Sequence, residues 1–217
     1  MDKEKLNKQI EHWNETYLSK PDMFGESPSY AAIKAAEKFK EKNVKNIIEL
    51  GAGQGRDTLF FAKKKFNINS LDYSQSGINN IIKKTEKQNL SKLVVPKCHD
   101  IRKSLPYKNE TFDACFSHML YCMALSNLDL ENLNKEIFRI LKPGGINIFT
   151  VRHTDDGDYK NGTYIGEDLY ENDGFIVHFF SKDKVNQLSK GFEILDIEKF
   201  EEGNFPRKLF KVTLKKK

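Results

Sequence analysis

Short apolar runs alternate with segments of helical period along this 217-residue chain. Apolar residues three and four positions apart predict helices, whereas short runs rich in Ile, Val and Phe predict buried strands. Because the two kinds of segment alternate, the pattern predicts an α/β fold with a doubly wound, mostly parallel sheet. Helices are expected within 1–42, from Ser74 and over 130–141, and strands at 46–49, 68–72, 93–95, 112–118 and 146–149.

The chain departs from this alternation after residue 150. Residues 152–174 are polar, rich in Gly and Tyr, and too numerous for an ordinary connection. We therefore expect residues 152–180 to form a lid or a substrate loop. A short helix from Ser181 and two strands, 192–197 and 207–214, complete the pattern.

A glycine-rich turn follows the first predicted strand. Gly51, Gly53 and Gly55 stand within five residues after Glu49, and a predicted helix begins near Arg56. Glycines let the chain bend sharply and bring bare backbone against a ligand, and the helix start points unpaired N–H groups at it. A second strand ends in Asp72, where a carboxylate can accept both ribose hydroxyls. Together these features predict a site for an adenosine-containing cofactor.

The sixth position of the turn bears on which cofactor binds. A dinucleotide fingerprint has glycine there, whereas this chain has Arg56. The pattern Glu-x-Gly-x-Gly-x-Gly instead resembles motif I of the class I S-adenosylmethionine-dependent methyltransferases. A nicotinamide-dependent oxidoreductase stays open as an alternative, because the glycine-rich turn and Asp72 suit it too.

Further segments resemble this family in the family's order along the chain: 98–101, 112–118, and 141–145 before the fifth strand. The likeness covers roughly residues 28 to 215 and implies a seven-stranded, mostly parallel sheet with a terminal antiparallel hairpin. It implies S-adenosylmethionine as cofactor and S-adenosylhomocysteine as product. The residues implied to bind the cofactor are Glu49, Gly51, Ala52, Gly53, Gly55, Arg56, Asp57, Asp72, Tyr73, Asp100, Ile101, Ser117 and His118.

Methyl transfer from a sulfonium needs mainly alignment of the reacting atoms, so no catalytic residue is obligatory. His118 follows the fourth strand and is the first candidate for a base, with Tyr121 one helical turn later. Arg152 and His153 follow the fifth strand, and Arg152 is expected to hold an anionic substrate. Trp13, Tyr17 and Tyr30, with Tyr121, are further candidates for substrate contact, because polar-tipped aromatics can close over a ligand.

Residues 1–42 are therefore expected to form two helices that also act as a lid. This segment and Gly-Arg-Asp-Thr at 55–58 show a likeness to the tellurite-resistance and thiopurine-type methyltransferases. No Asp/Asn-Pro-Pro-Tyr/Phe signature follows the fourth strand, and no Pro-Cys pair offers a cytosine nucleophile. We expect a small-molecule acceptor and no nucleic-acid partner. Binding of S-adenosylmethionine without turnover is the remaining alternative.

Composition agrees with a single domain over residues 1–217. The formal net charge is +5, with both signs interspersed and no dominant basic block. The first residues lack the apolar stretch of a signal peptide, and no run is apolar enough for a membrane span, so a cytoplasmic protein is expected. Cys98, Cys115 and Cys122 are expected to be reduced and buried. No metal site is expected, and the chain is expected to be a monomer or homodimer.

Overall fold

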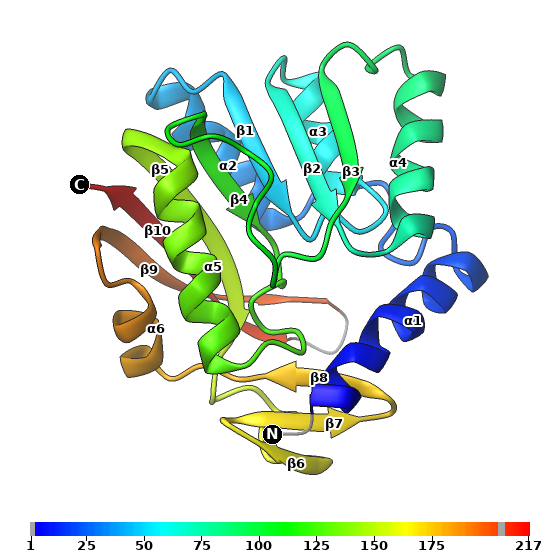
Figure 1. The fold of residues 1–217 in the computed structure, drawn as a ribbon, viewed down its shortest axis with the longest axis vertical. Helices are drawn as coiled ribbons and strands as arrows, with labels where there is room; N and C mark the ends of the chain where they lie inside the picture. The colour runs from blue at the N-terminus through cyan, green and yellow to red at the C-terminus, as the bar shows by residue number, and fades with distance from the viewer. Residues whose placement is uncertain (1–2, 204–206) are drawn as a thin grey trace.

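The computed structural model describes residues 3–203 and 207–217 of the chain. Its main sheet has seven strands in the order β3-β2-β1-β4-β5-β10-β9, with β10 antiparallel to both β5 and β9 (Figure 1). The predicted doubly wound, mostly parallel sheet with a terminal antiparallel hairpin is confirmed. The strands are β1 Asn46–Leu50, β2 Asn67–Asp72, β3 Val94–Cys98, β4 Phe112–Ser117, β5 Leu141–Arg152, β9 Phe192–Glu202 and β10 Arg207–Lys216.

Helices cover both faces of this sheet. On one face α2 and α3 pack in a cluster that includes Phe39, Phe61 and Phe116, and α4 lies against α3 near β2. On the other face α5 and α6 pack around Ile137 and Val185. The helices are α1 Lys3–Ser19, α2 Tyr30–Glu41, α3 Arg56–Lys63, α4 Gln75–Lys87, α5 Asn127–Ile140 and α6 Lys182–Leu188.

Burial on both faces explains why the central strands are continuous apolar runs. In β1, Ile47 belongs to the cluster under α2, and the next residue, Ile48, belongs to the cluster under α5. Ile47 pairs with Ile68 of β2 and with Ala114 of β4. The register places the carboxyl ends of β1, β2 and β4 at one edge of the sheet.

Side-chain caps set where the predicted helices begin. Ser74 accepts a hydrogen bond from the amide of Gly77 and starts α4, and Ser181 starts α6 in the same way. The helix expected over 130–141 is α5, which begins earlier, at Asn127, and ends at Ile140. Leu141 is already extended and begins β5, because the chain turns there toward the sheet.

The segment 152–180, expected to form a lid or a substrate loop, contains regular structure. It contains a second, antiparallel sheet of three strands: β6 Thr163–Gly166, β7 Leu169–Asn172 and β8 Phe175–His178. Tight turns join them, with positive φ angles at Glu167 and Asp168 and again at Asp173 and Gly174. The pair Asp173-Gly174 is itself a sequence signal for a β-hairpin, but the length of the whole segment favoured a loop instead.

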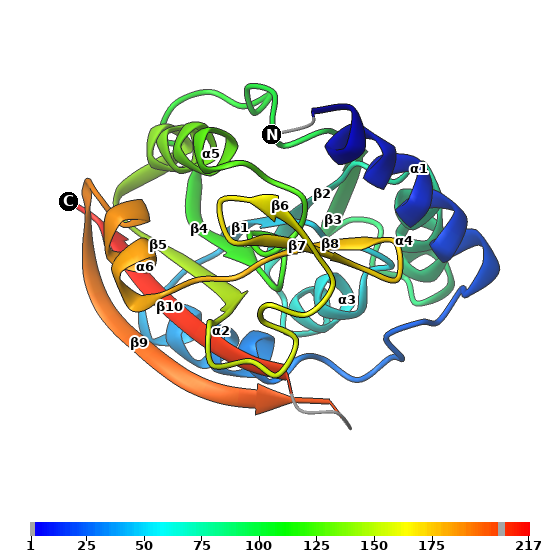
Figure 2. The ribbon, with the colours of Figure 1, turned by 90° about the horizontal axis from the view of Figure 1, so that it is seen from below.

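This second sheet and α1 lie side by side across the carboxyl ends of the main strands (Figures 1 and 2). Gln9 of α1 joins the two, since its Nε2 donates to the carbonyl of Gly174 at 2.8 Å and its Oε1 accepts from the amide of Ile176 at 3.3 Å. Both segments that were expected to act as lids thus lie over the same edge of the sheet.

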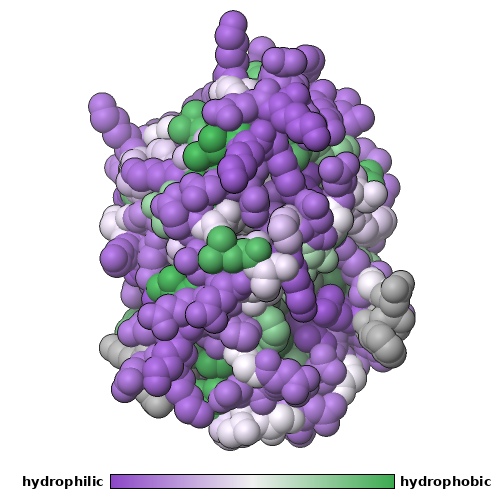
Figure 3. All heavy atoms as spheres, turned by 90° about the vertical axis from the view of Figure 1, so that its right-hand side faces the viewer, coloured by the Kyte–Doolittle hydropathy of each residue, from purple (hydrophilic) through white to green (hydrophobic). Residues whose placement is uncertain are grey.

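The face in Figure 3 is largely hydrophilic, with hydrophobic residues only in small groups. Within residues 3–203 and 207–217, no helix combines the length and apolarity needed to cross a bilayer. Cys115 and Cys122 are buried and unpaired as expected, whereas Cys98 is exposed, because β3 is an edge strand.

One buried histidine joins the second sheet to the main domain. His178 ends β8, and its Nδ1–H donates to the carbonyl of Leu125 at 2.8 Å. Its Nε2 accepts from the ammonium of Lys184 in α6, which can only donate. Burial, and then the charge of Lys184, lower the pKa of His178 to about 4. A proton on this ring would face an ammonium group without water to screen it.

We expect His178 to make the fold less stable in acid. An unfolded imidazole takes up a proton near its ordinary pKa of about 6.5, whereas the folded ring resists protonation until about 4. Between these values the unfolded chain binds more protons, so the free energy of unfolding falls as the pH drops. The contribution of this residue is about 2 kcal/mol between about pH 8 and about pH 5.

Urea unfolding at the two pH values measures the effect, and His178→Gln is the matched variant because it removes only the titrating ring. The loss of stability in acid should be about 2 kcal/mol smaller in the variant than in the unchanged protein. The same loss in both proteins would show that His178 does not titrate in this way.

Candidate active site

A cavity of about 780 Å³ lies at the carboxyl edge of the main sheet, beneath α1 and the second sheet. Its size suits a small-molecule or cofactor site. Fourteen of the residues selected from the sequence line it: Trp13, Tyr17, Glu49, Gly51, Ala52, Gly53, Arg56, Asp57, Asp72, Tyr73, Asp100, Ile101, His118 and Arg152.

The glycine turn forms the floor of the cavity. The amides of Gly51 and Ala52 both donate to the carbonyl of Leu71, at 2.8 and 3.0 Å, which holds the turn against β2. Gly51 and Gly53 have φ angles of 70° and 54°. A Cβ at Gly51 would lie 2.9 Å from Leu120, so glycine is required both by conformation and by space.

Asp72 is the fixed carboxylate of the site. Its Oδ2 accepts from the amide of Gly53 and its Oδ1 from the amide of Ser74, each at 2.8 Å. Each oxygen keeps a lone pair for a further donor in the cavity. Burial outweighs these two donors and raises the pKa of Asp72 to about 6.

Two more acids lie behind the turn. Glu49 is buried and accepts from the hydroxyl of Thr58. Burial, and then the neighbouring Asp57, raise its pKa well above the ordinary value. Asp57 accepts from both the amide and the hydroxyl of Ser29, at 2.8 Å each, and so ties α3 to the start of α2. These acids suit the positive groups of a ligand lying over the turn.

The loop after β3 supplies the next wall. Asp100 accepts from Nε of Arg102 at 3.0 Å and from its Nη2 at 2.8 Å, so its carboxylate is held in one orientation. His99 also lines the cavity, and its Nε2 is buried without a hydrogen-bond partner among the described residues. The sequence-based set omits His99, although its neighbours Asp100 and Ile101 are in it.

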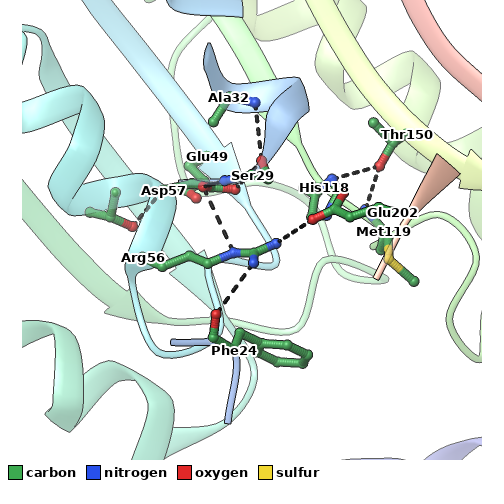
Figure 4. Close-up of polar contacts among 11 residues, drawn as sticks. Phe24, Ser29, Ala32, Glu49, Arg56, Asp57, His118, Met119, Thr150 and Glu202 are labelled. Carbon is green, nitrogen blue, oxygen red and sulfur yellow. Dashed lines mark hydrogen bonds and ion pairs between the residues drawn. The ribbon is translucent and has the colours of Figure 1, made fainter. Parts of the chain in front are cut away.

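His118 directly follows β4 and also lines the cavity, near Arg56 and Glu202 (Figure 4). Its Nδ1 lies 3.0 Å from the hydroxyl of Thr150, and its Nε2 lies 3.3 Å from Oε2 of Glu202. Arg56 reaches the same carboxylate from the start of α3 and also donates to the carbonyl of Phe24 at 3.4 Å. The cavity therefore has an acidic floor, and on the side of His118 it is lined by both acidic and basic side chains.

Aromatic side chains form the cover. Trp13 of α1 lies 5.3 Å from Tyr17 and 5.1 Å from Phe175 of the second sheet, measured between ring centroids. Phe24 lies 6.4 Å from both Trp13 and Tyr17. These rings line the cavity together with the glycine turn, so they present apolar surface to it. Phe175 was not selected from the sequence, since only the fold brings it to α1.

Three selected residues near the glycine turn, in β4 or after β4 lie outside the cavity. Tyr121 is fully buried, stacks on Phe149 with ring centroids 4.3 Å apart, and accepts from Asn147 at 3.5 Å. The helical spacing assumed between His118 and Tyr121 is absent, because a turn with φ of 57° at Met119 intervenes. The other two are Gly55, which packs against Ile81, and Ser117, which is buried in β4.

Tyr30 and His153 also lie away from the cavity. Tyr30 is exposed at the start of α2 and donates to Glu198 of β9 at 2.8 Å. His153 is buried against Phe210 and accepts from the amide of Asp155 at 3.0 Å. These contacts give both side chains a structural role.

Arg152 lines the cavity, but its charge is already matched. Its guanidinium donates to the carboxylates of Asp156 and Asp158. The central carbon of the guanidinium, Cζ, lies 5.2 Å from the ring centroid of Phe179. Both acids come from the segment that directly follows β5. The anion contact expected of Arg152 is therefore made within the chain itself. Within the described residues, no cluster of His, Cys, Asp and Glu is arranged to hold a metal ion.

Comparison with known proteins agrees with this geometry. Residues 47–145 match the family model of a methyltransferase domain. Phosphoethanolamine N-methyltransferase 1 from Triticum aestivum is 33% identical over 129 residues, which cover 58% of this chain and 22% of that protein. The chain thus spans less than a quarter of the length of that relative.

Two solved structures share the fold. A 1,6-didemethyltoxoflavin N1-methyltransferase from Burkholderia thailandensis, with its namesake compound and S-adenosylhomocysteine bound, has a TM-score of 0.76 at 14% identity, covering 96% of this chain and 87% of that one. TehB from Haemophilus influenzae has a TM-score of 0.69 at 18% identity, covering 94% and 67%. Residues 47–145 therefore match a methyltransferase domain, and the chain shares the fold of these S-adenosylmethionine-dependent methyltransferases.

Gly51 allows a direct test of the floor of the cavity. Gly51→Ala should lower the affinity for S-adenosylhomocysteine at least about tenfold, because the new Cβ collides with Leu120 and displaces it into the cavity. The positive φ should also cost about 1–2 kcal/mol of stability. Calorimetric titration and thermal unfolding measure the two effects.

Gly144→Ala is the matched control. Gly144 has a similar φ of 74°, but a Cβ there meets nothing within 4 Å. The control should lose similar stability and keep its affinity for S-adenosylhomocysteine. Equal affinities in the two variants would mean that the space at Gly51 does not matter for binding.

Proposed function

We propose that this chain transfers the methyl group of S-adenosylmethionine to a small-molecule acceptor. The observation that carries the proposal is the junction of β1 and β2, where the glycine turn and the buried carboxylate of Asp72 face one cavity. The cofactor supplies a methyl group bonded to a sulfonium, which leaves as a neutral thioether. The protein has to hold that group, shield it from water and align the acceptor.

The residues at the floor fit this cofactor. Asp72 offers two acceptor oxygens for ribose hydroxyls, and the bare backbone of Gly51 and Gly53 permits close approach of the amino acid part. Glu49 lines the same cavity, and a positive group of the cofactor beside it would favour its ionised form. Asp100 and the backbone of Ile101 supply polar contacts for the adenine edge, with His99 as a further candidate.

The acceptor is proposed to lie between His118 and the aromatic cover. The cover closes the site from α1 and from the second sheet, and the described residues that line the cavity enclose a space that suits a small molecule. His118 takes up the proton that an N–H, O–H or S–H acceptor loses as it is methylated. The Triticum relative is named for N-methylation of a small amine, which supports an acceptor of modest size.

Two measurements test this function together. Calorimetry should show binding of S-adenosylmethionine and S-adenosylhomocysteine, and mass spectrometry should show methylated product from a panel of small amines, phenols and thiols. No binding of either cofactor form would refute the proposal. Tight binding without product from any acceptor class would instead indicate a cofactor-binding protein without turnover.

Asp72 should make cofactor binding depend on pH. Its pKa of about 6 means that the carboxylate is lost below that pH, and with it the acceptors for the ribose hydroxyls. Affinity for S-adenosylhomocysteine should therefore fall as the pH is lowered through about 6. Asp72→Asn should weaken binding by about 1–3 kcal/mol at neutral pH and remove this pH dependence. Calorimetry on both proteins between about pH 5 and about pH 8 gives the comparison, and an unchanged affinity in the variant contradicts the role.

His118 should matter for turnover more than for cofactor affinity. His118→Asn should lower kcat about a hundredfold if the ring accepts the proton, while the affinity for S-adenosylhomocysteine changes little. Steady-state kinetics and calorimetry separate the two. A matching loss of both would show that His118 only supports the shape of the cavity.

A further inference from the structure

A carboxylate that no sequence pattern indicated closes the acceptor side of the cavity. Glu202 is the last residue of β9, and its side chain reaches the cavity from the terminal hairpin. Its Oε1 accepts from Nη2 of Arg56 at 3.3 Å, and its Oε2 lies 3.3 Å from Nε2 of His118. Figure 4 shows these side chains converging. Three segments far apart in the sequence meet at this one group.

The ring of His118 is held from the other side as well. Its Nδ1 lies 3.0 Å from Oγ1 of Thr150, and the same oxygen accepts from the amide of Met119 at 2.8 Å. Met119 has a φ of 57°, a left-handed conformation that is uncommon for a residue with a side chain. The ring is therefore fixed between a hydroxyl and a carboxylate.

This arrangement constrains where protons can lie. An ionised carboxylate only accepts, so Glu202 favours the forms of His118 in which Nε2 is protonated. The hydroxyl of Thr150 can donate to Nδ1 or accept from it, so Nδ1 keeps a partner in either state. Glu202 thus carries the charge opposite to that of a doubly protonated ring.

The charge of Glu202 is itself maintained by its neighbours. Burial alone would raise the pKa of Glu202, but His118 and Arg56 outweigh burial and hold it below the ordinary value. Asp57 lies 3.9 Å from Nε of Arg56, and Arg207 faces Glu202 across the hairpin. Among the described residues, Oε2 forms no aligned hydrogen bond, and Nε2 of His118, at 3.3 Å, is the nearby donor from which it can accept.

We propose that Glu202 is the positioning residue of His118 and that the two side chains take up the acceptor's proton as one unit. The inference rests on the proposed function and deepens it. The acceptor atom forms a bond to the methyl carbon, and the carbon–sulfur bond breaks with its electron pair on sulfur. The proton of the acceptor atom passes to the pair, whose single negative charge is neutralised.

Glu202→Gln tests the inference, because it keeps the size of the side chain and removes its charge. Glu201→Gln is the matched control: Glu201 is exposed and points to the other side of the strand. Ring-nitrogen NMR of His118 in the protein alone follows the gain of the second proton. The midpoint of that titration should move about one pH unit lower in Glu202→Gln and stay in place in Glu201→Gln.

Kinetics provide the second measurement. In Glu202→Gln, kcat should fall about tenfold or more and the acid limb of the pH profile should move to lower pH, while affinity for S-adenosylhomocysteine stays within about threefold. Glu202→Asp keeps the charge and should recover part of both effects. Thermal unfolding of each variant confirms that it is folded.

The outcomes separate this inference from the proposed function. An unmoved NMR midpoint, or a normal kcat in Glu202→Gln, overturns the pairing while methyl transfer by the unchanged protein still stands. A moved midpoint in a protein that methylates no acceptor overturns the proposed function and the proton-transfer role with it. A moved midpoint together with the loss of kcat supports both.

Discussion

The buried carboxylate of Asp72 is the contact on which the site depends. It joins the amide of Gly53 in the glycine turn to the amide of Ser74 at the start of α4. The carbonyl of Leu71, one residue earlier, receives the amides of Gly51 and Ala52. The turn, the end of β2 and the starts of two helices are thus fixed relative to one another, and the floor of the cavity is rigid before any ligand arrives.

The cover of the cavity is built by different means. α1 and the second sheet meet through a few aromatic rings and through Gln9, and His178 joins that sheet to α5 and α6. Such contacts are fewer than those within the main sheet. The main sheet thus provides a fixed floor for the cofactor, and α1 and the second sheet form a cover that is attached separately. Such an arrangement suits substrate entry, because the cover can move without disturbing the floor.

Charges on the acceptor side are matched within the chain. Arg152 is neutralised by Asp156 and Asp158, so it is not left to capture an anionic acceptor. Arg56 is shared between Phe24 and Glu202. The imidazole of His118, which we propose as the proton acceptor, lies 3.3 Å from the carboxylate of Glu202 in the terminal hairpin.

The sequence by itself determined the features whose physics is local. A glycine turn needs positive φ angles, a helix needs a cap such as Ser74, and buried strands need apolar runs, so the fold, the turn and Asp72 were all predictable. Tertiary structure decided the rest. It removed Tyr121 from the cavity through one turn at Met119, folded 152–180 into a sheet, and brought Glu202 to His118 across more than eighty residues. Contacts between distant segments depend on how whole elements pack, and no local pattern records that packing.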